Sequence, residues 1–175
     1  MVFGNAETFA IESAVDDQRL DKNIFFGLFR YWVGGKQLGN WEAGTPLEDI
    51  AAGLEWHLNF EIDQCDNVFE GMTDKMILER VQSACWATES TLPAYIEGDN
   101  VRFEKYCLCP TTSEAFDGWE AVITQKQGAQ RLIWRKRNSG DEVRIQPLNF
   151  GEFESVIRLF LKWFQQMQMA RSNGN

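Results

Sequence analysis

A stripe of seven large apolar side chains near the end of the chain sets the strongest constraint on its fold. The stripe follows Asn149, a residue type that favours the N-cap of a helix, and its members recur at intervals of three and four residues. A helix with so wide an apolar face must cover another apolar surface, and a sheet provides one. The stripe consists of Phe153, Val156, Ile157, Phe160, Leu161, Phe164 and Met167.

Consecutive strand-turn-strand segments predict that sheet. An aromatic-rich run over residues 24–33 meets Gly34-Gly35 and continues into residues 36–41, which is the pattern of a tight hairpin. The turn residues Gly98-Asp99-Asn100 and Gln127-Gly128 predict two more hairpins. The other predicted strands cover residues 8–12, 94–97, 101–108, 119–124, 130–137 and 143–146.

Two further helices are predicted between the hairpins. Thr45-Pro46-Leu47-Glu48 has the order of a capping box, with Thr45 at the N-cap and proline at the first helical position. Apolar residues then recur at helical spacing, at Leu47, Ile50, Ala51, Leu54 and Leu58. A second helix is predicted to start at Thr73 and to bury Met76, Ile77, Val81 and Ala84.

These patterns predict an α+β fold. We expect an antiparallel, twisted sheet of consecutive hairpins with two or three helices packed on it, among them the helices over residues 47–58 and 153–167. No linker or repeat divides the sequence, so residues 1–170 are expected to form a single globular domain. The tail over residues 171–175 is expected to be frayed.

An acidic run lies between Lys36 and Lys75. It holds nine carboxylates and no Lys or Arg, and like charges on one compact surface repel each other. Such a surface suits a cationic partner, although solubility alone also favours acidic surfaces. The acidic run consists of Glu42, Glu48, Asp49, Glu55, Glu61, Asp63, Asp66, Glu70 and Asp74.

The first part of the chain is acidic and the last part is basic. The first 125 residues hold 22 acidic and 8 basic side chains, whereas the last 50 hold 4 and 9. A basic cluster therefore stands near the predicted hairpin at Gln127-Gly128, at Arg131, Arg135, Lys136, Arg137 and Arg144. With a formal net charge of -9 the chain repels nucleic acid, so these cations are expected to pair with the acidic part of the fold. We therefore expect no nucleic-acid binding.

Residues suited to catalysis are few. His57, the one histidine, stands at the flank of an apolar helical stripe, where a side chain that seals the core is expected. Cys65, Cys85, Cys107 and Cys109 lack the spacing of a zinc site and are expected to be reduced thiols. We expect no catalytic residues, no metal and no cofactor. With no signal peptide or membrane span in the sequence, the expected compartment is the cytoplasm.

Two short motifs carry a resemblance to a known family. Phe3-Gly4-Asn5 is followed by Thr8-Phe9-Ala10-Ile11, with Ala6 in place of an expected proline, and a later strand ends in Gly34-Gly35-Lys36-Gln37-Leu38-Gly39. In these first forty residues the chain resembles the bacterial immunity protein 42 family of polymorphic toxin systems. The resemblance implies a small cytoplasmic protein that binds a cognate toxin domain and blocks it, and it implies no catalytic residues.

The acidic run and the resemblance together predict where the partner binds. Glu61, Asp63, Asp66 and Glu70 follow the first predicted helix, where a loop presents them. Asp49 and Trp56 share one face of that helix, and a large aromatic there suits an interface anchor. A basic, nuclease-type toxin fits such a surface. Two other functions stay open, an intracellular adaptor or regulatory protein without a toxin partner and a small metal-dependent enzyme. The sequence does not indicate an oligomeric state.

Overall fold

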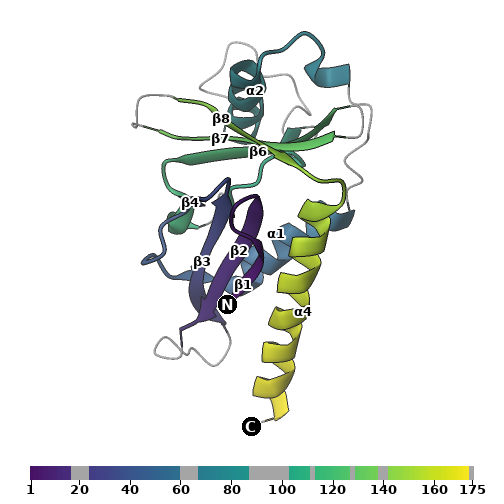
Figure 1. The fold of residues 1–175 in the computed structure, drawn as a ribbon. Coiled ribbons are helices and arrows are strands. Elements are labelled where there is room, and N and C mark those ends of the chain that lie inside the picture. Colours follow the sequence, from purple (N-terminus) through teal and green to yellow (C-terminus); the bar gives the residue numbers. More distant parts are fainter. Residues whose placement is uncertain are drawn as a thin grey trace.

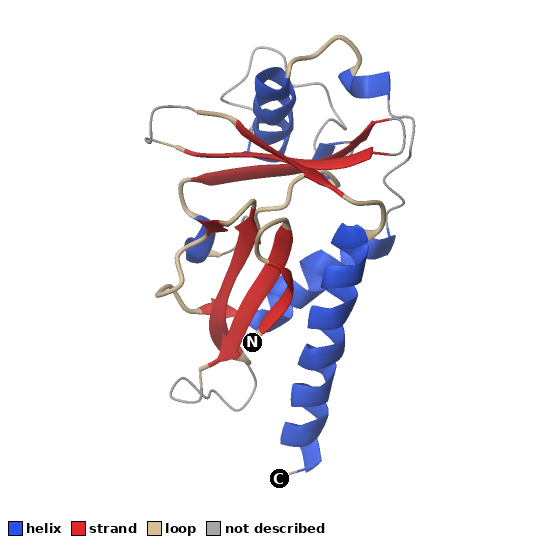
Figure 2. Cartoon of the chain, viewed as in Figure 1, coloured by secondary structure: helices blue, strands red, loops and turns tan. Residues whose placement is uncertain are grey.

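The described residues form two antiparallel sheets and three helices (Figure 1). The structure is a computed structural model, and it describes residues 1–16, 24–59, 67–86, 103–110, 113–126, 129–137 and 142–173. Figure 2 shows the two sheets in red, one above the other, with a long helix beside the lower one. The predicted α+β class, with antiparallel hairpins and packed helices, is confirmed. The hairpins are divided over two sheets, where we expected one.

The first sheet is built from the N-terminal strands. Its strands are β1 (Val2–Asn5), β2 (Phe9–Val15), β3 (Phe26–Val33), β4 (Lys36–Leu38) and β5 (Thr45–Pro46). They follow the order β1-β2-β3-β4, and β5 pairs with the start of β3. Burial alternates along β3, as in a strand with one face on the core. Gly34 and Gly35 form its turn at φ angles of 57° and 71°, which confirms the predicted hairpin.

The second sheet follows the hairpin predicted at Gln127-Gly128. It consists of β6 (Trp119–Lys126), β7 (Ala129–Lys136) and β8 (Arg144–Leu148), in that order. Trp119 pairs with Lys136 and Lys126 with Ala129, so β6 and β7 align along their full lengths. This hairpin and the strand after it were both predicted.

The described helices are divided between the two sheets. Helices α1 (Leu47–Asn59) and α4 (Glu152–Asn173) pack on the first sheet and against each other, while α2 (Asp74–Trp86) packs on β6 and β7 (Figure 1). Two short 3₁₀ turns, η2 (Asn67–Phe69) and η3 (Glu114–Phe116), lie between them along the chain. None of the described helices is long and apolar enough to cross a membrane.

The apolar stripe of α4 lies in the core, as its periodicity predicts. Ile157 and Phe160 are fully buried, and the Phe160 ring lies 5.4 Å from that of Phe29 on β3 and 6.0 Å from that of Phe3 on β1. Aromatic pairs at these separations add to the hydrophobic stabilisation. The helix runs to Asn173, beyond residue 170, and the Arg171 guanidinium lies 4.5 Å from the centre of the Phe25 ring.

The motifs that carry the family resemblance form one structural corner. Gly34 N donates to Thr8 O at 2.9 Å and Gly35 N donates to Ala6 O at 2.9 Å, so the β1–β2 and β3–β4 turns are bonded together. The Thr8 hydroxyl donates to the Glu152 carboxylate at the start of α4. These motifs therefore hold two turns and a helix end together.

Three local predictions are wrong. Residues 101–108 form no strand where described, because Phe103 begins a helical turn and Cys107 makes a single bridge to Val122. Met76 on α2 is 50% exposed, whereas Ile77, Val81 and Ala84 are buried as predicted.

The third wrong prediction is the capping box of α1. Thr45 forms no such box, because it pairs with Gly27 in the sheet, and the Glu48 carboxylate accepts from Phe25 N at 2.6 Å instead. The hairpin predicted around Gly98-Asp99-Asn100 lies outside the described residues.

Candidate binding surface

Helix α1 presents one face to the core and the opposite face to solvent. Its buried residues are Leu47, Ile50, Ala51, Leu54 and His57. Asp49 and Trp56 lie two turns apart on the other side, with Asp49 exposed and Trp56 half-buried. The Trp56 ring lies 5.4 Å from the His57 ring in an edge-on arrangement. The structure therefore brings these two predicted binding residues to one side of the helix, with Trp56 also packed within its own chain.

A cavity of about 220 Å³ opens beside this face of α1. The helix contributes Asp49, Gly53, Trp56 and His57 to its lining, and the segment over residues 104–110 contributes Glu104 and Pro110. Two carboxylates therefore border the cavity, and the described residues that line it include no Lys or Arg. Sequence reasoning missed Glu104 and Pro110, because they lie about fifty residues from α1 along the chain and no local pattern marks them.

His57 closes the inner side of the cavity, and the predicted core position is confirmed. It is 7% exposed, and its Nε2 lies 2.9 Å from the Cys107 carbonyl oxygen. Burial lowers the pKa of His57 from 6.5 to about 4, against the opposing effect of hydrogen bonds to the backbone of Cys107 and Lys105. The imidazole is therefore neutral at pH 7, and Nε2 carries the proton that it donates to Cys107 O.

The low pKa of His57 predicts a stability that falls in mild acid. The unfolded chain binds a proton near pH 6.5 and the folded chain only near pH 4, so stability is fully present above pH 6.5 and is lost as the pH falls toward 4. Between pH 7 and pH 5 the free energy of unfolding is expected to drop by about 2 kcal/mol through this group. Urea unfolding at the two pH values measures this change. His57→Gln, which cannot titrate, should lose most of it, and an equal drop in that variant would contradict the assignment.

Three free thiols lie near His57. Cys85 is half-buried, while Cys107 and Cys109 are buried, and Cys65 lies outside the described residues. A hydrogen bond between Cys85 and Cys107 raises the pKa of Cys85 and lowers the pKa of Cys107, which indicates that Cys85 donates to the Cys107 sulfur. No group of three or more His, Cys, Asp or Glu residues in the described part of the chain is arranged to hold a metal ion.

Among the described residues, one carboxylate of the acidic run forms an ion pair. The Asp74 carboxylate lies 2.8 Å from Arg131 on β7, a partner that sequence proximity does not reveal. Over the described ranges, no ion pair involves Glu42, Asp49, Glu55 or Glu70, all of which are exposed. Glu61, Asp63 and Asp66 lie outside the described residues, so the structure places only Asp49, Trp56 and Glu70 of the six predicted binding residues. Of these three, Asp49 and Trp56 border the cavity.

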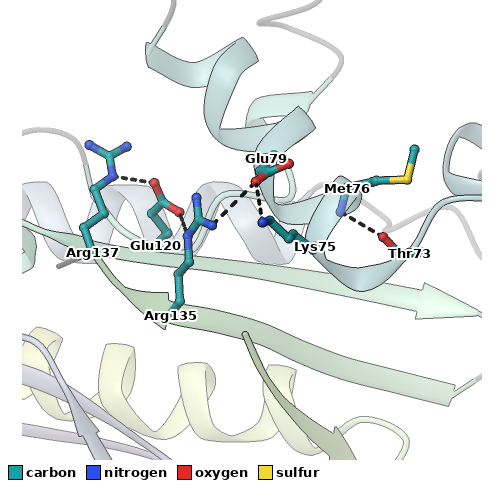
Figure 3. Close-up of polar contacts among 7 residues, drawn as sticks. All are labelled: Thr73, Lys75, Met76, Glu79, Glu120, Arg135 and Arg137. Atoms are coloured by element: carbon teal, nitrogen blue, oxygen red, sulfur yellow. Dashed lines mark hydrogen bonds and ion pairs between the residues drawn. The ribbon is translucent and has the colours of Figure 1, made fainter. Parts of the chain in front are cut away.

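The basic cluster pairs within the chain, as expected. Arg135 lies 2.5 Å from Glu120, a residue of β6 that is 3% exposed, and 3.7 Å from Glu79 of α2. Arg137 pairs with the other oxygen of the Glu120 carboxylate. Figure 3 shows this network between β6, β7 and α2, with Lys75 also directed at Glu79. Arg135 thus joins the second sheet to α2.

Comparison with known proteins gives a family and a fold. The immunity protein 42 family profile matches residues 1–163. The crystal structure of CdiI from Burkholderia dolosa AUO158 superposes with a TM-score of 0.68 at 18% sequence identity, over 93% of this chain and 99% of that one. No curated protein matches the sequence. At that identity the solved structure supports the fold alone, whereas the family match spans both sheets and about the first half of α4.

Proposed function

Because the chain belongs to the immunity protein 42 family, whose members bind and neutralise a cognate toxin, we propose that its acidic run meets the toxin. The observation that carries the proposal is the solvent face of α1. There Asp49 is exposed, has no ion pair among the described residues and lines the same cavity as the half-buried Trp56. A charge for attraction and an aromatic for burial are the two elements that a tight interface combines.

The rest of the proposed interface follows α1 along the chain. Glu70 is exposed just after η2, and Glu61, Asp63 and Asp66 stand between it and the end of the helix in the sequence. Carboxylates of this kind accelerate encounter with a cationic partner and contribute less to holding the complex. Trp56 would contribute mainly to the lifetime of the complex.

The charge of the acidic run favours a basic toxin. Enzymes that act on nucleic acid surround their active sites with cations, and an acidic protein placed there excludes the substrate while it is attracted by the same field. We therefore propose a nuclease-type toxin that is bound in the cytoplasm, with neither nucleic acid nor membrane as a partner. The internal pairing of the basic cluster supports this proposal, since those arginines are engaged with Glu120, Glu79 and Asp74.

Neutralisation by binding predicts a stoichiometric titration. When purified immunity protein is added to a fixed amount of its toxin, toxin activity should fall in proportion and end at a fixed molar ratio, whatever the incubation time. Occlusion requires no general base and no turnover. The measurement is residual toxin activity against the molar ratio after short and long incubations. Progressive inactivation by a small molar fraction of the protein would contradict binding as the mechanism and would indicate an enzyme.

A further inference from the structure

Gly53 stands in the middle of α1 without a structural reason to be glycine. No described atom lies within 4 Å of the place where its Cβ would be, and its φ angle is not positive. In a helix interior, glycine is about 1 kcal/mol less favourable than alanine. Its position lines the cavity, one turn after Asp49 and just before Trp56. The missing side chain therefore leaves the cavity open on its helical side.

The chemistry of the cavity walls suits a cation. Asp49 and Glu104 are exposed carboxylates at its border, and the Trp56 ring offers a surface on which ammonium and guanidinium groups bind. Leu54 supplies an apolar wall for methylene groups.

The size of the cavity suits one side chain. Its volume of about 220 Å³ is below the roughly 300–1,000 Å³ typical of pockets that enclose small-molecule ligands. We propose that this cavity receives a single lysine or arginine side chain of the toxin, with the cationic group between Asp49, Glu104 and Trp56. The inference rests on the proposed function, because it takes the toxin as the partner, and it deepens that function by naming the group that is recognised.

A larger side chain at position 53, which would fill part of the cavity, tests this inference. Gly53→Leu places a side chain in space that no described atom occupies and raises helix propensity, so the variant should fold at least as stably as the wild type. Its complex with purified cognate toxin should dissociate at least ten-fold faster, measured by surface plasmon resonance. Ala170→Leu, an exposed helical position on α4, is the matched control for an added apolar side chain. Equal dissociation rates for the two variants would overturn the proposal.

A double-mutant cycle identifies the group that enters the cavity. Each Lys and Arg of the toxin is replaced by alanine and combined with Asp49→Asn/Glu104→Gln, with Glu142→Gln as the control for an exposed carboxylate. One basic toxin residue should show a coupling of ten-fold or more with the double variant and none with the control. Coupling of ten-fold or more to none of the basic toxin residues would overturn the proposal. The salt dependence of association tests separately whether the acidic run meets the toxin. The proposal for the cavity and the proposal for the acidic run can therefore fail independently.

Discussion

Replacing Trp56 by alanine is expected to speed dissociation of the toxin complex about thirty-fold or more. The indole is half-buried and lines a cavity that two exposed carboxylates also line, the setting in which aromatic side chains become interface hot spots. A hot spot contributes about 2 kcal/mol or more, and each 1.4 kcal/mol is a factor of ten in affinity. Most of that change falls on dissociation rather than association. Surface plasmon resonance with the purified toxin measures both rates.

Trp56 also packs against His57, so folding must be followed in parallel. Urea unfolding of Trp56→Ala gives the loss of stability within the chain. Trp56→Phe is the conservative variant, because it keeps an aromatic ring at the cavity. We expect its complex to have a lifetime between those of the wild type and of Trp56→Ala. Dissociation of a folded Trp56→Ala variant at the wild-type rate would show that the indole serves packing within the chain alone.

Replacing Glu120 by alanine is expected to lower the free energy of unfolding by about 3 kcal/mol or more. Its carboxylate is almost fully buried and accepts from two arginines, Arg135 and Arg137, so its removal leaves the half-buried Arg135 guanidinium with one acceptor fewer (Figure 3). Because Arg135 also approaches Glu79, the loss should weaken the attachment of α2 to the second sheet. Thermal and urea unfolding measure the effect.

An exposed ion pair provides the matched control for Glu120. Glu142 pairs with Arg144 at 3.2 Å, with 71% and 43% of the two side chains exposed. Because exposed pairs contribute about 1 kcal/mol at most, Glu142→Ala should change stability little. Equal losses of unfolding free energy for Glu120→Ala and Glu142→Ala would show that the buried Glu120 contributes no more to stability than an exposed ion pair.

Local periodicity made much of this fold predictable. The stripe of α4, the Gly34-Gly35 hairpin and the β6–β7 hairpin depend on residues that are close in sequence, and each is present as predicted. The division into two sheets depends on pairing between distant segments, so the sequence pattern did not reveal it. β5 is an example, since Thr45 satisfies a capping pattern and yet pairs with Gly27.

The candidate site was likewise predictable only where its residues are close in sequence. Helical spacing was enough to place Asp49 and Trp56 together, because both lie on α1. The wall opposite them comes from Glu104 and Pro110, in a segment that the strand pattern misassigned, so the cavity itself was not predictable. Charge counting likewise identified the acidic run but not the partner of Asp74, because Asp74 lies on α2 and Arg131 lies on β7, far away along the chain.

The most direct test of the acidic run is the rate at which the protein associates with its toxin. The triple variant Asp63→Lys/Asp66→Lys/Glu70→Lys reverses three of its charges, and Glu7→Lys/Asp117→Lys/Glu142→Lys makes the same change in net charge outside the run. Stopped-flow association is measured for both variants and the wild type at low and high salt. The first variant is expected to associate about ten-fold or more slowly than the control at low salt, and its association rate should depend less on salt. Equal rates and equal salt dependence in the two variants would show that the acidic run is not where the toxin binds.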